Sequence, residues 1–215
     1  MAGYEHAFRV ICEKCGKSFD KEFRIYTVIN TDFQSNLVEK LKSDKLNTVT
    51  CPCCNAVFTY ERPHLAYSLS KKYAINALCS YTGGFKHLGR SHMFGMFGIS
   101  GMRFRLVNYL CEVSEKVRIF ELGLDDIKIE HLKFDNFGEE YFADKSDKIL
   151  LFKEIFDNDI VFEFRDDVDN VLETYRIPFE EYNNCCDLPQ PPTQHNGAIL
   201  WSKIDNNYIK EIIND

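Results

Sequence analysis

The sequence has no apolar run approaching the roughly 20 residues that cross a lipid bilayer. Its opening residues, MAGYEHAFRVICEKCG, also lack the basic start and apolar stretch of a secretory signal. We therefore expect a cytoplasmic protein with no membrane partner. In a reducing cytosol the nine cysteines are expected to be metal ligands or buried thiols, because disulfides are rare there.

Acidic residues are missing from residues 62–111, although this stretch carries seven basic residues. Residues 112–215 carry 25 acidic and 11 basic residues, and the whole chain has a net charge of −7. This net charge argues mildly against a general nucleic-acid binder. The uneven distribution still has two interpretations. Either the two segments face each other or water, or segment 62–105 contacts an anionic partner.

Phosphate-loop and dinucleotide-binding spacings are also absent, even from the glycine-rich residues 81–105. This segment holds six of the eleven glycines and three of the four methionines. It can be a surface loop, a contact for a protein partner through its Met and Phe residues, or a site for single-stranded nucleic acid or another anion. The candidate anion contacts are Lys86, Arg90, Arg103 and Arg105.

Two Cys-x-x-Cys pairs are the strongest signal in the sequence. They are Cys12 with Cys15, in CEKC, and Cys51 with Cys54, in CPCC. Tetrahedral zinc takes four thiolates, and a tight turn lets two of them converge from one short segment. The pairs therefore predict a structural zinc site with all four positions filled by protein. Iron in a rubredoxin-like centre and a redox dithiol are the alternatives, because thiols alone do not select the metal.

The residues around the cysteines suit such turns. Gly16 and Asn55 follow the two pairs at positions where a left-handed backbone is expected, and Pro52 fixes φ within the second turn. Cys53 lies inside the second turn with its side chain expected to point away from the metal. We therefore expect Cys53 to be a bystander.

Each turn precedes a predicted strand. Residues 18–29 alternate apolar and polar side chains, and residues 55–63 form a second candidate strand that Pro63 ends. Between them, Thr31 and Gln34 fit a capping box ahead of a short helix with Phe33, Leu37 and Leu41 on one face. The plan is a zinc ribbon with a partly helical insertion.

The same stretch resembles the CpXC domain family. The resemblance rests on the first Cys-x-x-Cys, on INTDFQSNLVEKLKSDKLNTVTCPCC and on the strand ending near HLAYSL. A later block, RFRLVNYLCEVSEKVRIFELGLDDIKIEHLKF at 103–134, resembles the second half of the family domain. The family's four cysteines then correspond to Cys12, Cys15, Cys51 and Cys54. Asn55 departs from the glycine that many members have, and residues 81–102 match nothing.

The C-terminal part predicts further folded elements. Residues 147–157 are predicted as a helix, residues 159–164 and 172–179 as strands, and residues 205–215 as a helix capped by Asp205. Asp125 or Asp126 is expected to cap the element that follows Gly123. We treat residues 8–135 as a CpXC-like domain that includes segment 81–105, and residues 136–215 as a C-terminal α+β region.

The fold class predicted from all this is α+β, built on zinc-ribbon-like four-cysteine knuckles with a helical insertion, plus mixed strands and helices after them. The function predicted is a zinc-stabilised cytosolic binding or scaffold protein, with a protein as its partner. The alternative is an enzyme or nucleic-acid-processing factor that uses segment 62–105. No nucleophile–base pair stands out in the sequence, so the prediction leans away from an enzyme.

Overall fold

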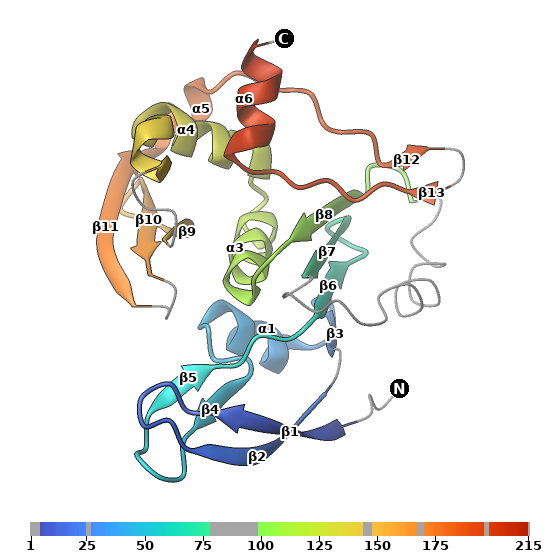
Figure 1. Ribbon diagram of the computed structural model, residues 1–215. Coiled ribbons are helices and arrows are strands. Elements are labelled where there is room, and N and C mark those ends of the chain that lie inside the picture. The colour runs from blue at the N-terminus through green and yellow to red at the C-terminus, as the bar shows by residue number, and fades with distance from the viewer. Residues whose placement is uncertain are drawn as a thin grey trace. The chain divides into compact units, whose positions relative to one another are not determined.

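The computed structural model describes residues 5–24, 27–77, 99–143, 148–166, 170–195 and 198–214. Helices and several small sheets make up this part of the chain (Figure 1), which confirms the α+β class. The chain divides into two compact units. The first comprises Met1–Ser100 and Val107–Ser114, and the second comprises Gly101–Leu106 and Glu115–Asp215. Residues 115–135 thus group with the C-terminal part, while the domain boundary at 135 stays a prediction.

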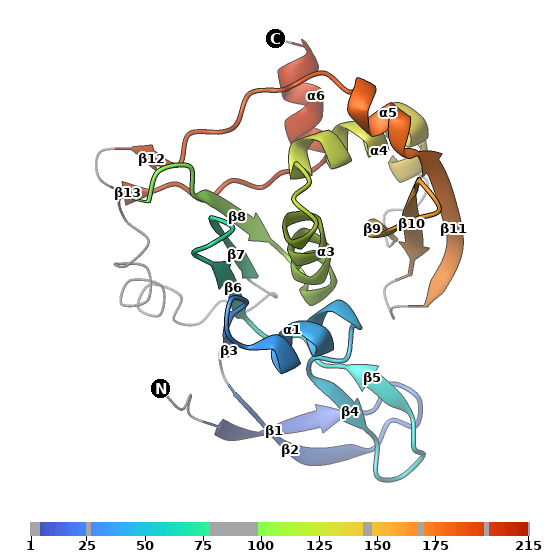
Figure 2. The same cartoon turned by 180° about the vertical axis from the view of Figure 1, so that it is seen from behind.

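Two short antiparallel hairpins carry the cysteine turns of the first unit. Strands β1 (Glu5–Ile11) and β2 (Ser18–Arg24) form one hairpin, and β4 (Thr48–Thr50) and β5 (Val57–Thr59) form the other. Figures 1 and 2 show them side by side from opposite directions. Buried Val10 and Val49 pack between them with a few half-buried aromatic side chains. We call these four strands and their turns the knuckle hairpins.

The chain between and after these hairpins forms a small sheet with one helix. Strand β3 (Thr27–Asn30) pairs parallel to β6 (His64–Ser68), which pairs antiparallel to β7 (Tyr73–Ala77). Helix α1 (Ser35–Lys42) follows β3 and buries Val38 and Leu41. The predicted helical insertion between the two cysteine pairs is therefore confirmed.

The predicted start of this helix was wrong in detail. The residue that caps α1 is Gln34, and the side chain of Thr31 makes no cap. The hydroxyl of Thr31 instead lies 2.7 Å from the hydroxyl of Tyr73. Neither half of the predicted capping box forms, because Oε1 of Gln34 accepts from the N–H of Asn30 at 2.7 Å and the N–H of Thr31 donates to the carbonyl of Tyr67. Tertiary contact with β7 thus outcompetes the local cap.

In the second unit, an antiparallel sheet has the order β11-β10-β9, with β9 spanning Ile149–Phe156, β10 spanning Asp159–Arg165 and β11 spanning Val171–Pro178. Both strands predicted here are confirmed, but the helix predicted at 147–157 was wrong, since this stretch is β9. Leu150, Leu151 and Phe152 are all buried, and a strand buried on both faces lacks the alternation that identifies strands. Asp157 and Asn158, both at positive φ, form the two-residue turn to β10.

The second unit also contains helices. Helix α3 (Leu110–Glu121) begins in the first unit and continues into the second, and α4 (Asp126–Ala143) is interrupted at Gly138. Helix α5 (Phe179–Asn184) and helix α6 (Asn206–Asn214) follow later. Helix α5 contacts β11, and α4 contacts both α5 and α6. The unit also holds β8 (Arg103–Val107) and the paired short strands β12 (Gln194–His195) and β13 (Ala198–Ile199). None of the described helices is long and apolar enough to span a membrane.

Three predicted helix boundaries are confirmed in this unit. Gly123 adopts φ +74° at the end of α3, where its own N–H donates to the carbonyl of Phe120. The carboxylate of Asp125 accepts from the N–H of Ile127 at 2.8 Å and so caps α4. At α6, Oδ1 of Asp205 accepts from the N–H of Tyr208 at 3.2 Å, as predicted.

Candidate metal centre

The two cysteine turns have matching backbone hydrogen bonds. In the first, residues 12–17, the N–H of Gly16 donates to the carbonyl of Cys12 at 2.7 Å, and the N–H of Cys12 donates to Lys17. In the second, residues 51–56, the N–H of Asn55 donates to the carbonyl of Cys51 at 3.0 Å, and the N–H of Cys51 donates to Ala56. Two separate segments have thus folded into the same knuckle.

A left-handed residue closes each knuckle. Gly16 has φ +68° and Asn55 has φ +56°, as the sequence predicted for both positions. Glycine adopts this conformation freely, and asparagine tolerates it better than most other residues. The departure from glycine at Asn55 is therefore compatible with the same turn.

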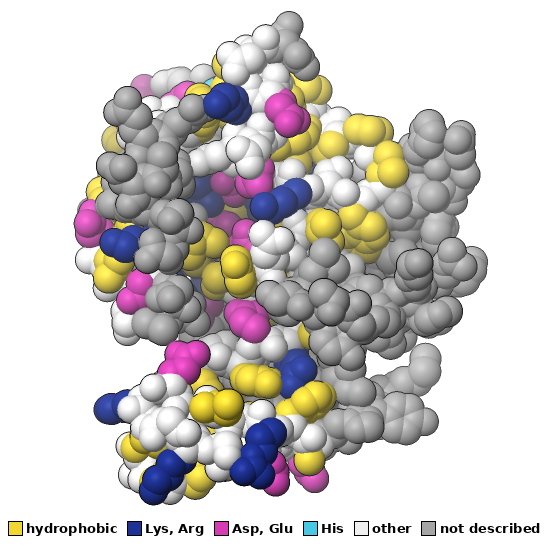
Figure 3. All heavy atoms as spheres, in the orientation of Figure 1, with side chains coloured by type: hydrophobic (Ala, Val, Ile, Leu, Met, Phe, Trp, Pro, Cys, Tyr) yellow, Lys and Arg dark blue, Asp and Glu magenta, His cyan; other side chains and the backbone are white. Residues whose placement is uncertain are grey.

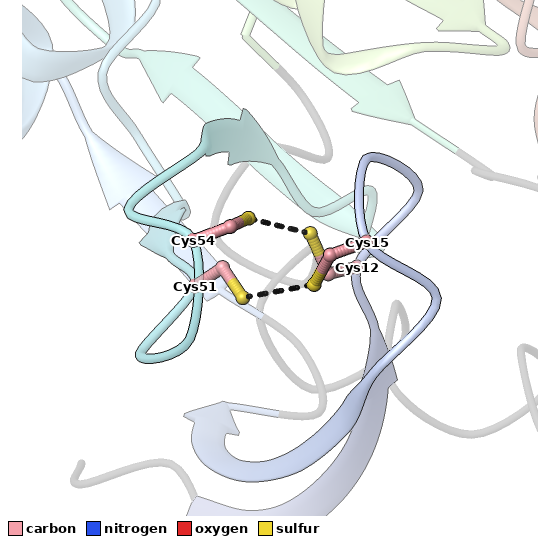
Figure 4. Close-up of side chains that lie close together, drawn as sticks. All are labelled: Cys12, Cys15, Cys51 and Cys54. Atoms are coloured by element: carbon pink, nitrogen blue, oxygen red, sulfur yellow. Dashed lines mark hydrogen bonds between the residues drawn. The ribbon is translucent and has the colours of Figure 1, made fainter.

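The four sulfurs meet between the knuckles (Figure 4). The Sγ atoms of Cys12 and Cys54 lie 3.6 Å apart, and those of Cys15 and Cys51 lie 3.8 Å apart. All four sulfurs lie within 4.8 Å of one another. These separations exceed the ~2.05 Å of a disulfide bond. A tetrahedron with metal–sulfur bonds of about 2.3 Å has edges of about 3.8 Å, so the cluster has the dimensions of a four-thiolate metal site.

The backbone prepares one of these thiols to ionise. Hydrogen bonds from the N–H groups of Cys54 and Cys53 outweigh the effect of burial and lower the pKa of Cys51 to about 6. The N–H of Lys17 also lowers the pKa of Cys15, but burial and the neighbouring thiols outweigh it and raise that pKa to about 12. Negative charge on one sulfur thus opposes charge on the next, and a bound cation removes this opposition.

Cys53 stays outside the cluster. Its side chain is exposed, and it is not among the four clustered cysteines. A hydrogen bond from Lys17 to Cys53, together with the charge of that sulfur, raises the pKa of the Lys17 ammonium. Lys17 therefore supplies positive charge beside the knuckles.

The predicted anion contacts lie in different surroundings. Lys86 and Arg90 fall outside the described residues. Arg103 is half-buried with its guanidinium 4.0 Å from the ring centre of Phe120. Arg105 is 1% exposed and donates to both carboxylate oxygens of Asp126, at 2.7 and 3.0 Å. The role of these residues in binding an anion stays a prediction.

Sequence analysis missed a network of buried charges in the second unit. Its bases and acids are Arg105, Lys116, Lys133, Glu115, Asp126 and Glu130, each at most 6% exposed. The Nζ of Lys116 lies 3.0 Å from Glu130 and 3.5 Å from Asp126. The Nζ of Lys133 lies 2.6 Å from Glu115 and 3.1 Å from Glu130. These carboxylates are thus paired with bases, which agrees with a structural role.

The ion pairs also shift the pKa values of groups in this network. Lys116 and Arg105 outweigh the burial of Asp126 and lower the pKa of its carboxyl group to about 2. Three carboxylates beside Lys116 likewise outweigh its burial and raise the pKa of its ammonium. Asp126 was one of two candidate helix caps in the sequence, and its position at the start of α4 gave no sign of the partner 21 residues earlier.

Comparison with known proteins places this geometry in a family. A model of the CpXC protein family matches residues 10–133, a span that contains both knuckles and more than half of the chain. Searches of curated proteins and of solved structures returned no match. The matched region and its four clustered cysteines show that this chain belongs to the CpXC family.

Proposed function

We propose that this protein is a zinc-stabilised cytosolic binding or scaffold protein whose knuckle hairpins are fixed by a Zn²⁺ ion held by Cys12, Cys15, Cys51 and Cys54. The sulfur geometry carries this proposal, because the separations of 3.6 and 3.8 Å match the edge of a zinc–thiolate tetrahedron. Rubredoxin-like iron is the alternative occupant, and metal analysis of the purified protein separates the two.

A metal in this position has a structural role and does not act on a substrate. Four protein ligands fill a tetrahedral zinc site, so no coordination position remains for a water or substrate. Cys12 and Cys51 are fully buried, which further shields the ion. The proposed role is therefore to fix the knuckle hairpins as a binding surface.

Exposed apolar side chains near the knuckles support a protein partner. Ile11 immediately precedes the first knuckle and is 63% exposed, and Val57 immediately follows the second and is 64% exposed. Phe33, just before α1, is exposed as well. Figure 3 shows hydrophobic and basic side chains interspersed on the visible face of this unit. Aromatic and aliphatic side chains flanked by charge are common at protein interfaces.

Single cysteine substitutions test the proposal. Cys12→Ser and Cys54→Ser each remove a ligand and are expected to lose the tightly bound zinc and unfold the knuckle hairpins. Cys53→Ser is the matched control, because it removes a neighbouring exposed thiol and keeps all four ligands. Zinc content of the three purified proteins gives the result, and equal content in all three would refute the site.

Partner capture tests the binding role separately. The full chain and the Phe33→Ser variant are compared for proteins retained from the native host, with single-stranded nucleic acid tested at low salt, where attraction between bases and phosphate is strongest. Protein retained by the full chain and lost with Phe33→Ser supports the proposal. Tight nucleic-acid binding without a protein partner favours the alternative role of segment 62–105.

A further inference from the structure

A second group of metal-ligating side chains lies in the second unit. His131 and Asp135 are one turn apart on α4, and Cys185 directly follows α5. Their ligand atoms all lie within 4.8 Å of one another. Residues four apart share a helix face, so α4 presents an imidazole and a carboxylate together to the end of α5. The sequence separates Cys185 from His131 by more than fifty residues and gave no sign of this meeting.

The spacing of the first two ligands suits a small divalent cation. The Nε2 atom of His131 lies 3.3 Å from Oδ2 of Asp135. Zinc bonds of about 2.0–2.1 Å to nitrogen and oxygen give a tetrahedral edge of about 3.3–3.4 Å. His131 is buried and Asp135 is exposed, so the cluster has one closed side and one side open to solvent.

Cys186 occupies the other side of the imidazole. Its Sγ atom lies 3.8 Å from Nδ1 of His131. A histidine that binds a metal through one nitrogen needs a partner for the N–H on the other, which fixes the tautomer. Cys186 is placed to be that partner at Nδ1, which leaves Nε2, the nitrogen next to Asp135, for the metal.

The charges around the cluster are partly balanced. The carboxylate of Asp135 belongs to the cluster itself, and Lys128, one turn before His131 on α4, is paired with Asp187 at 2.8 Å. A divalent ion would be balanced by the Asp135 carboxylate and by a Cys185 thiolate, because a thiol that coordinates a metal gives up its proton.

We propose that His131, Asp135 and Cys185 form a second metal site, for a divalent transition-metal cation such as Zn²⁺. Nitrogen, oxygen and sulfur ligands together suit cations of borderline softness and disfavour Mg²⁺ and Ca²⁺, which prefer oxygen. Three protein ligands leave a fourth position to water or to a side chain of a bound partner. The site therefore differs from the closed four-thiolate cluster and does not depend on it.

Zinc titration of the intact protein tests this proposal. Protein already holding one equivalent is titrated with Zn²⁺ under reducing conditions against a chromophoric chelator. The wild-type protein is expected to take up a second, weaker equivalent, and Cys185→Ser is expected to lose it while keeping the first. Cys186→Ser is the matched control at the neighbouring position. It should keep the second equivalent with an affinity about tenfold weaker, as for other residues that orient a ligand.

Co²⁺ gives an independent readout of the same site. A second cobalt equivalent should add thiolate-to-cobalt absorption in the wild-type protein and none in Cys185→Ser. A wild-type chain that binds a single equivalent, or a Cys185→Ser variant that binds the second as tightly as wild type, would show that His131 and Asp135 form an ion pair only. Failure of the knuckle site would appear separately, as loss of the first equivalent from all of these proteins.

Discussion

The knuckle hairpins and the α3–α4 region of the second unit solve the same problem in opposite ways. Each must hold polar groups away from water. The hairpins bring four thiols together into one cluster. The hydrophobic core next to this cluster is small, with Val10 and Val49 as its buried residues. The α3–α4 region, together with Arg105 from β8, buries three acids and three bases that neutralise one another through short ion pairs. If the proposed zinc site is right, one region depends on an ion taken from solution, while the other carries its own counter-charges.

The largest expected effect is removal of the knuckle metal. A structural zinc typically contributes an apparent ~10–16 kcal/mol, which is comparable with the whole stability of a domain. A strong chelator should therefore unfold the knuckle hairpins and leave the α3–α4 region folded. Hydrogen exchange is the measurement, with fast exchange expected in β1, β2, β4 and β5 and unchanged protection in α3 and α4. Equal loss of protection in both regions would remove the contrast between them.

The next effect comes from breaking the buried charge network. Asp126→Ala leaves Arg105 and Lys116 without a carboxylate that lies within 3.5 Å of both. Removing one member of a buried ion pair typically costs about 3–5 kcal/mol, because a desolvated charge remains. Urea unfolding followed by fluorescence of Trp201, the one tryptophan, measures the change.

The control for this prediction is a surface ion pair of the same unit. Asp187, whose side chain is 92% exposed, pairs with Lys128, and Asp187→Ala should cost about 1 kcal/mol or less. The loss in free energy of unfolding must be clearly larger for Asp126→Ala than for Asp187→Ala. A loss below about 1 kcal/mol for Asp126→Ala would mean that the buried charges are not held as the ion pairs indicate.

In the first unit, we expect the free energy of unfolding to depend on pH, with a change that is no larger than the loss expected for Asp126→Ala. His64 is fully buried, and burial lowers its pKa from 6.5 to about 4 despite the hydrogen bond to Pro63. Its Nδ1–H donates to the carbonyl of Pro63 at 2.6 Å, and its Nε2 accepts from the side-chain amide of Asn47 at 3.0 Å. Only the Asn47 contact requires the neutral ring, because Nε2 must accept there, whereas Nδ1–H donates to the carbonyl of Pro63 in either protonation state.

The sign follows from the lowered pKa. The unfolded state binds a proton more readily, so the contribution of His64 is complete above pH 6.5 and is lost as pH falls toward 4. The loss amounts to about 3 kcal/mol for this single group. The free energy of unfolding in urea should fall less steeply between pH 7 and pH 4 in His64→Gln than in the wild-type protein. The comparison separates the effect of His64 from the protonation of the thiolates, which both proteins share. Identical slopes would contradict the assignment.

The smallest effect is expected at the cap of α6. Asp205 accepts from the N–H groups of Asn207 and Tyr208, and an N-cap replaced by alanine typically costs about 1 kcal/mol. Thermal unfolding of Asp205→Ala should show this loss. Asn207→Ala is the control, because Asn207 is an exposed residue in the first turn of α6, and this variant should lose less stability. A larger loss for Asn207→Ala would place the cap elsewhere.

The parts of the fold that the sequence predicted are those set by neighbouring residues. The Cys-x-x-Cys spacing, Gly16 and Asn55 describe complete turns, and Asp205 describes a helix start. The joining of the two knuckles also followed from sequence, because a tetrahedral ion needs four ligands and each turn supplies two.

The parts that it missed depend on distant contacts. The first half of β9, Leu150–Phe152, is buried on both faces, so its apolar run resembles a helix as much as a strand. Asp126 had the position of a helix cap, and its partner Arg105 comes from β8. Cys185 gave no sign of His131, because α5 and α4 meet only through the tertiary structure.

X-ray absorption at the zinc edge tests the central claim most directly. Protein holding one zinc equivalent is predicted to show four sulfur ligands at about 2.3 Å and no nitrogen or oxygen ligand. A first shell that contains nitrogen or oxygen, or fewer than four sulfurs, would contradict a closed site formed by Cys12, Cys15, Cys51 and Cys54.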